Sequence, residues 1–128
     1  MRFMLLMYRD EKVWDVKPEA ERLAIRQRAI DTSEALRARG IYLAGDPLLP
    51  TGTAVTVRMT GGKPTATDGP FAETKDLIAG WMIIDVDSYD RALELAGELS
   101  AAPGAGGRPI HEWLELRPIM AAPPTIED

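Results

Sequence analysis

Four short segments of the chain are apolar or alternate apolar and polar residues, which is the pattern of β-strands. Residues 3–8 and 80–86 are almost wholly apolar, as expected of strands that lie centrally in a sheet. Residues 41–44 form a shorter apolar segment, and residues 110–116 alternate between apolar and polar positions. The first and last predicted strands therefore stand close to the two ends of the chain.

Two longer segments place apolar residues three or four positions apart, which predicts amphipathic helices. The first runs from Pro18 to Arg39, begins with a proline suited to a first helical turn, and ends before Gly40. One stripe of this helix carries Ile25, Ala29, Thr32 and Leu36. The second helix, residues 88–100, begins at an Asp-Ser pair that is suited to capping a helix N-terminus.

Between these units, residues 54–59 and 63–67 surround a Gly-Gly turn, which predicts a β-hairpin. The order of elements is then β-α-β, an inserted hairpin, and β-α-β. This order predicts an α+β fold of the ferredoxin-like kind, β-α-β-β-α-β with an inserted β-hairpin. We expect one domain over residues 1–120 and a Pro-rich extended tail over residues 121–128.

The composition narrows the classes of function. The 128 residues include no cysteine, which excludes disulfides, thiolate metal sites and a cysteine nucleophile. The formal net charge is −5 with no basic block, so we expect no nucleic-acid partner. The apolar runs are far shorter than the ~20 residues of a membrane helix, and residues 3–8 are too short for a secretory signal. We therefore expect a cytoplasmic protein that has no membrane partner.

The predicted sheet leaves one of its faces without cover. Two helices cover only one face of a four-stranded sheet, whereas the strands at both ends of the chain are too apolar to face water. A second copy of the chain is the simplest cover, because most oligomers are symmetric. We therefore expect a homodimer, with Trp81 and Trp113 as aromatic residues of its interface.

Residues 68–75, Asp-Gly-Pro-Phe-Ala-Glu-Thr-Lys, resemble the signature of the DGPF branch of the YCII-related family. Segments that resemble the same family are MLLMY with the acidic pair after it, ALRARG, LAGDPL, TVR and ELRPIM. The resemblance spans most of the chain and implies ferredoxin-like subunits that pair through their sheets as a dimeric α/β barrel. It also implies a cleft between sheet and helices, walled by the loop after the hairpin, but it implies no known reaction.

One feature of the family's better studied branch is missing from this chain. That branch has a histidine near the start of the first helix, with an aspartate partner. Here residues 21–25 read Glu-Arg-Leu-Ala-Ile, and the single histidine, His111, lies in the last predicted strand. The His–Asp pair therefore cannot be transferred, and His111 is more simply explained as a surface or interface residue.

The loop of residues 68–75 carries the candidate chemistry. If it closes a cleft, Asp68 or Glu73 would act as a general base, while Lys75 or Arg58 would hold an anionic group of a substrate. Tyr8, at the end of the first strand, would add a hydroxyl group that binds the same substrate. Burial and mutual charge in such a cleft would move the carboxyl pKa values toward neutrality.

The same loop also has a purely structural explanation. Asp68 with the Gly-Pro after it is a turn-forming sequence, and Phe71 would fill the core beneath the loop. The methionines, Met59 among them, would fill gaps in the core. A cation held by Asp68 and Glu73 would be a hard-ion site, which we rank lower, so no metal and no cofactor are predicted.

Two classes of function remain open. One is a small-molecule enzyme that uses acid–base chemistry in a cleft near residues 68–75. The alternative is a non-catalytic ligand-binding or regulatory module that docks on a protein partner. An enzyme needs Asp68 or Glu73 to face a partly enclosed pocket, whereas a binding module can use these side chains for turn hydrogen bonds.

Overall fold

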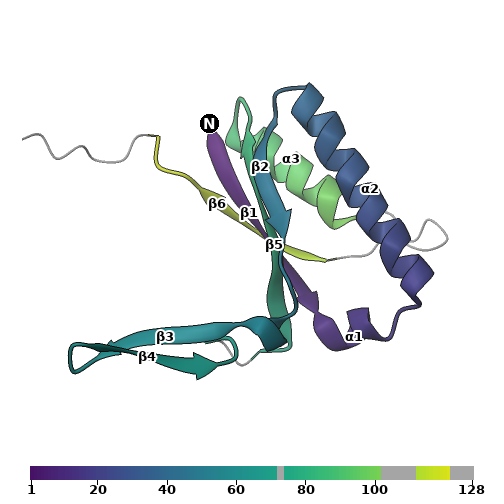
Figure 1. Cartoon of the computed structure of the whole chain (residues 1–128). Coiled ribbons are helices and arrows are strands. Elements are labelled where there is room, and N and C mark those ends of the chain that lie inside the picture. Colours follow the sequence, from purple (N-terminus) through teal and green to yellow (C-terminus); the bar gives the residue numbers. More distant parts are fainter. Residues whose placement is uncertain (72–73, 102–111, 122–128) are drawn as a thin grey trace, which may run out of the picture.

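The structure is a computed structural model of the chain and describes residues 1–71, 74–101 and 112–121. Figure 1 shows the arrangement of its elements. In chain order they are β1 (Arg2–Asp10), α1 (Glu11–Asp15), α2 (Glu19–Ala38), β2 (Tyr42–Pro47), the single 3-10 turn η1 (Thr51–Thr53), β3 (Val55–Thr60), β4 (Lys63–Asp68), β5 (Asp76–Asp85), α3 (Tyr89–Ser100) and β6 (Trp113–Pro118).

The larger of two sheets has the strand order β2-β5-β1-β6, and all its neighbouring strands are antiparallel. The prediction of an α+β fold is confirmed, and this strand order is that of a ferredoxin-like unit. The first strand, β1, lies in the middle of the sheet and pairs with both β5 and the last strand, β6. The sheet is open and does not close into a barrel within one chain.

The core lies between the sheet and the two long helices, which stand together on one face of the sheet (Figure 1). Phe3, Leu5 and Ile84 are fully buried there, and Leu36 of α2 and Leu95 of α3 pack against the same cluster. Phe3 and Leu5 are two positions apart, so both point to the helical side of β1. The alternate residues of β1 must therefore point away from the helices.

The helices begin where the sequence provides caps. The Ser88 side chain accepts a hydrogen bond from the Arg91 amide at 3.1 Å, as predicted for the start of α3. The segment 9–17 contains a short helix, α1, that the sequence pattern did not predict. Asp10 caps it by accepting from the Lys12 amide at 3.1 Å, and Trp14 is buried. No helix within the described residues is both long and apolar enough to cross a membrane.

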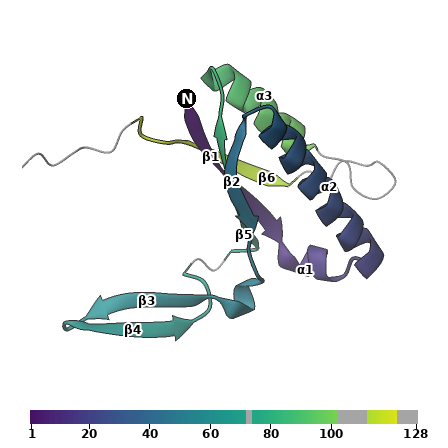
Figure 2. The same cartoon turned by 45° about the horizontal axis from the view of Figure 1, so that its top comes forward.

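The predicted hairpin is confirmed as β3 and β4, which form a separate two-stranded sheet. Gly61 and Gly62 make its turn with φ values of +58° and +78°, a conformation that favours glycine. Figures 1 and 2 show that the hairpin extends as an arm from one end of the larger sheet, on the side opposite α2 and α3. Met59 on this arm is 70% exposed, so its predicted place in the core is wrong.

The close packing of β2 against β5 leaves no room for a side chain at Gly45. A Cβ at this position would lie 2.6 Å from the Trp81 carbonyl oxygen and 2.6 Å from Tyr42 Oη, closer than real contacts allow. We predict that Gly45→Ala lowers the free energy of unfolding by about 1–3 kcal/mol, measured by urea denaturation. Gly52→Ala is the matched control because nothing lies within 4 Å of its Cβ. Equal stabilities of the two variants would contradict the close packing.

Candidate functional site

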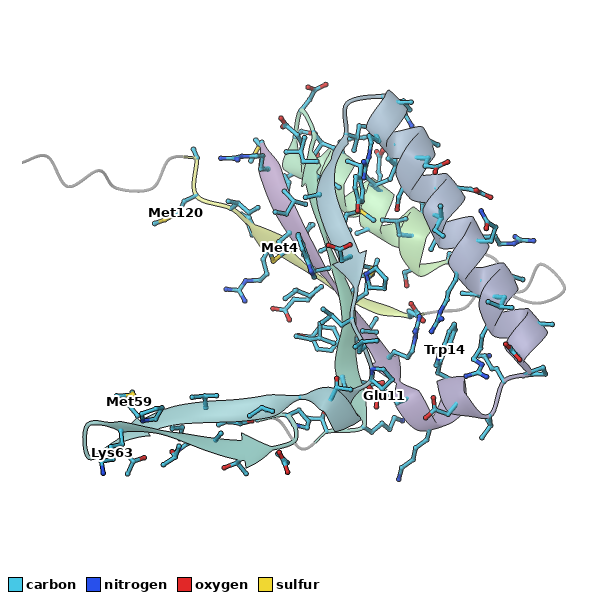
Figure 3. All side chains as sticks on the ribbon, viewed as in Figure 1. Met4, Glu11, Trp14, Met59, Lys63 and Met120 are labelled. Atoms are coloured by element: carbon cyan, nitrogen blue, oxygen red, sulfur yellow. The ribbon has the colours of Figure 1, made fainter. Side chains whose placement is uncertain are left out.

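The sheet face opposite the helices is formed by side chains of β5, β1 and β6. We call it the open sheet face. Its residues include Met4, Leu6, Tyr8, Trp81, Ile83, Trp113, Glu115 and Arg117, and the same registers place Arg2 and Asp85 at its far end and Asp46 at its β2 edge. Met4 lies on this side, away from α2 and α3 (Figure 3). The side chains of its centre are apolar or aromatic, and Trp113 is 71% exposed. The face therefore combines an apolar centre with the polar cluster of Tyr8, Glu115 and Arg117.

The polar cluster joins the ends of two neighbouring strands. The Tyr8 hydroxyl on β1 donates a hydrogen bond of 2.8 Å to Glu115 Oε2 on β6. Arg117 Nη1, two residues farther along β6, donates to Glu115 Oε1 at 3.2 Å. Glu115 and Arg117 lie two residues apart on one face of β6, which allows this ion pair. The predicted binding residue Tyr8 thus has a carboxylate and a guanidinium group as neighbours.

The shared hydrogen bond moves the pKa values of Tyr8 and Glu115 in opposite directions. The bond to Glu115 raises the pKa of Tyr8, and partial desolvation of the hydroxyl adds to this effect. The bond from Tyr8 lowers the pKa of Glu115, and the bond from Arg117 lowers it further. At neutral pH Tyr8 therefore keeps its proton and Glu115 is ionised. The cluster can offer a ligand a neutral hydroxyl group beside one negative and one positive charge.

Asp68 and Lys75, two of the loop residues predicted for the site, lie near the root of the arm. Asp68 ends β4 directly opposite Val55, so both side chains lie on the same face of the hairpin. Arg58 lies on the other face, with its guanidinium 5.6 Å from the centre of the Phe71 ring. Lys75 is exposed just before β5 begins. The structure therefore separates Asp68 from Arg58, and Glu73 lies outside the described residues.

Backbone contacts fix the beginning of this loop. Gly69 has a φ of +101°, and its amide donates to the Ala54 carbonyl at 2.8 Å. The Thr56 hydroxyl donates to the Gly69 carbonyl at 2.8 Å. Phe71 is 77% exposed and contacts Arg58, so its predicted role of filling the core is wrong. The Asp-Gly sequence acts here as a hairpin closure, and the aromatic ring is left at the surface.

A second cluster, on the helical side of the sheet, was missed by sequence reasoning. Arg9 Nε lies 3.0 Å from Glu112 Oε1, and the Arg9 guanidinium lies 3.7 Å from the centre of the Trp14 ring. Arg26 of α2 approaches the same ring at 5.8 Å. The available signal was a tryptophan in an otherwise polar connection, because a buried Trp14 needs partners. This cluster holds α1 against β1 and leaves little of Arg9 free for a ligand.

Two further observations concern pockets and metal sites. A depression of about 320 Å³ lies at the end of the sheet away from residues 68–75. It is lined by Met1, Arg2, Asp85, Pro118, Ile119 and Ala121. In the part of the chain that the structure describes, no three His, Cys, Asp or Glu side chains are grouped as metal ligands would be. The depression is therefore not the cleft that was predicted beside the loop.

The comparisons with known proteins add a family and one relative. The model of the YCII-related domain matches residues 1–114, which include Tyr8 and the segment 68–75. An uncharacterised protein of Rhizobium meliloti (strain 1021) is 35% identical over 127 residues. The match covers 97% of this chain and 96% of that relative, so the two chains are similar throughout their length. Glu115 and Arg117 lie just beyond the residues that the family model matches.

The Tyr8–Glu115 bond makes stability depend on pH. Because the folded-state pKa of Glu115 is lowered, its contribution is present above the unfolded-state pKa and is lost as the pH falls through the folded-state pKa. We predict that the Tm difference between wild type and Glu115→Gln is largest near pH 7 and shrinks toward pH 3. Circular dichroism melts measure it. When Glu115→Gln is made in a Tyr8→Phe background, we expect a smaller change in Tm at pH 7 than the same substitution causes in the wild type. A Tm difference that is independent of pH would contradict the assignment.

Proposed function

The chain belongs to the family of YCII-related domains, and we propose that it works as a cytoplasmic homodimer that binds a small molecule beside Tyr8. In this proposal the open sheet faces of two copies pack together. The ligand lies at the Tyr8 end of the gap between them, near the root of the arm. The observation that carries the proposal is the hydrogen-bonded pair of Tyr8 and Glu115 beside the apolar centre of a sheet face that neither long helix covers.

The uncovered apolar face supports the homodimer. Both long helices stand on the opposite face of the sheet, so neither covers Leu6, Trp81 or Trp113. Leu6 and Trp81 are half-buried among their neighbours, and Trp113 is 71% exposed. Apolar patches of this kind on a small protein are typical of interfaces, and tryptophans are enriched there. A two-fold pairing places the same face of each copy against the other, and sheets packed face to face lie about 10 Å apart.

The polar cluster supports a ligand in that gap. Packing of the two faces would bury Tyr8 and Glu115, and buried polar groups need hydrogen-bond partners. Arg117 uses one donor for Glu115 and is 66% exposed, so it can also bind a carboxylate or phosphate group. A ligand with one anionic group and one hydrogen-bonding group would satisfy all three side chains.

Acid–base catalysis extends this proposal to the loop. Asp68 stands at the arm root, and Asp68 or Glu73 would serve as the general base. Lys75 or Arg58 would hold an anionic group, and Tyr8, whose single proton is donated to Glu115, would accept a hydrogen bond from the reacting molecule. These roles require the loop and the open sheet face to border one cavity in the dimer.

The second candidate is a non-catalytic ligand-binding or regulatory module that docks on a protein partner. The exposure of Phe71 favours it, because an aromatic side chain at a loop surface is typical of a contact with another protein. In that case Asp68 and Lys75 would serve the docking surface and would take no part in proton transfer. Turnover of a bound small molecule, lost in Asp68→Ala while binding persists, would distinguish the enzyme from the module.

We predict that Leu6→Asp makes the protein monomeric, because it places a charge in the centre of the proposed interface. Sedimentation velocity at 10 to 100 micromolar, roughly the range where weak dimers form, measures the change. Leu23→Asp is the matched control, since Leu23 is exposed on the outer side of α2. A wild-type protein that is monomeric in this range would refute the homodimer.

A thermal-shift screen of small carboxylates and phosphate esters tests the ligand site. A true ligand at a hundredfold excess over its Kd stabilises the protein by about 2.7 kcal/mol. We expect Tyr8→Phe and Glu115→Gln to lose this shift, and Asp68→Ala to lose it only if Asp68 contacts the ligand. Glu94→Gln, on the exposed side of α3, is the control. A shift that is the same in Tyr8→Phe would place the ligand elsewhere.

A further inference from the structure

The hairpin arm has one apolar face and one polar face. Val55, Val57 and Met59 of β3 share a face with the residues directly opposite them on β4, which are Asp68, Ala66 and Pro64. We call this the inner face of the arm. The other face carries Thr56, Arg58, Thr60, Lys63, Thr65 and Thr67. Val57 is 62% exposed, so the apolar stripe on the inner face lies open to water.

An arm of this kind needs cover. A two-stranded hairpin is marginally stable in water unless it packs against another element. Both strands of the arm are also edge strands, and apolar edge strands that stay exposed promote aggregation. In Figures 1 and 2 none of the described helices stands over the arm. Because none of the helices in the described part of the chain covers Val57 and Met59, we look for their cover in another molecule.

The direction of the arm shows where that molecule lies. The arm leaves the sheet on the side opposite the helices, so the arm and the open sheet face form a corner (Figures 1 and 2). Met59 lies on the side of the arm turned toward this corner, and Lys63 lies on the other side (Figure 3). Whatever packs on the open sheet face therefore also meets the inner face of the arm.

The length of the arm exceeds the gap between two packed sheets. Six residues of β3 span roughly 20 Å at about 3.3 Å per residue, whereas packed sheets lie about 10 Å apart. A second copy seated on the open sheet face would therefore meet Val55 and Val57 beside its own sheet. Met59 and Pro64, at the tip, would extend past that sheet to the flank of the second copy.

We propose that the arm clasps a second copy of the chain, so that two arms are exchanged across the two-fold axis of the dimer. The inference rests on the proposed function, because it takes the packing of the two open sheet faces as given. A second copy fits better than a different protein because the inner face of the arm and the proposed dimer interface border the same corner (Figures 1 and 2). Along that face, Asp68 at the arm root is the one charged side chain among the residues of β3 and β4.

The clasp would also complete the ligand site. Asp68 shares the inner face with Val57, so the partner that covers Val57 also closes the space beside Asp68. Tyr8 and Glu115 come from the sheet of one copy, while the wall opposite Asp68 comes from the other. Neither copy alone would enclose the cavity.

Two variants of the arm that carry the same added charge test the clasp. Val57→Asp places a carboxylate on the inner face, and Thr67→Asp places one on the other face of the same hairpin. We expect Val57→Asp to raise the dimer Kd at least tenfold in sedimentation equilibrium, and Thr67→Asp to change it less than twofold. Unchanged circular dichroism melts of the monomers would show that both variants fold. Equal dimer Kd values for the two variants would overturn the clasp.

Hydrogen exchange of residues 55–68 gives a second readout. In a clasped dimer the amides of β3 and β4 should exchange slowly, and the protection should disappear when Leu6→Asp separates the subunits. Protection that persists in that monomer would show that the arm is covered by its own chain, which overturns the inference. A wild-type dimer with a fast-exchanging arm would refute the clasp and leave the sheet-to-sheet dimer intact. A monomeric wild type would refute both.

Discussion

A four-stranded sheet has two faces to cover, and both long helices of this chain lie on the same one. The packing of Phe3, Leu5 and Ile84 against α2 and α3 forms the core. It also fixes which side chains of the central strands point toward the helices and which point away from them. Because side chains alternate along a strand, burying these residues forces Met4 and Leu6 to the opposite face. The uncovered face, the polar cluster on it and the arm beside it all follow from this one-sided cover.

The polar cluster depends on the same alternation in two strands. The side chains of Tyr8 on β1 and Glu115 on β6 both point to the open sheet face. The antiparallel register of the two strands then brings the hydroxyl to 2.8 Å from the carboxylate. This bond is the largest cause of their opposite pKa displacements. A neutral hydroxyl next to an ionised carboxylate within an apolar surface is an arrangement suited to binding a polar ligand, which is the basis of the proposed function.

The two sheets differ in how many packing contacts they receive from the rest of the described chain. The larger sheet has a core on one side, whereas the described contacts of the arm of β3 and β4 are its own ladder, the contacts at its root and the contact of Arg58 with Phe71. The Gly69 amide and the Thr56 hydroxyl hold that root in place. The residues that resemble the family signature therefore begin by closing the hairpin, and Asp68 acquires its orientation from β4. This connects the signature to the arm more directly than to a cleft under the helices.

Local sequence determined the elements whose signals lie within a few residues of one another. The Pro18 start and Gly40 end of the first long helix, the Gly61–Gly62 turn and the Ser88 cap were all predictable for that reason. Prediction failed where contacts between elements decide: Trp14 of α1 is buried against Arg9 of β1 and Arg26 of α2, and Phe71 lies at the surface beside Arg58. Tyr8 was identifiable as a candidate, but its partner Glu115 is 107 residues away. Only the register of β1 against β6 decides that pairing, because it is set by the packing of the whole sheet.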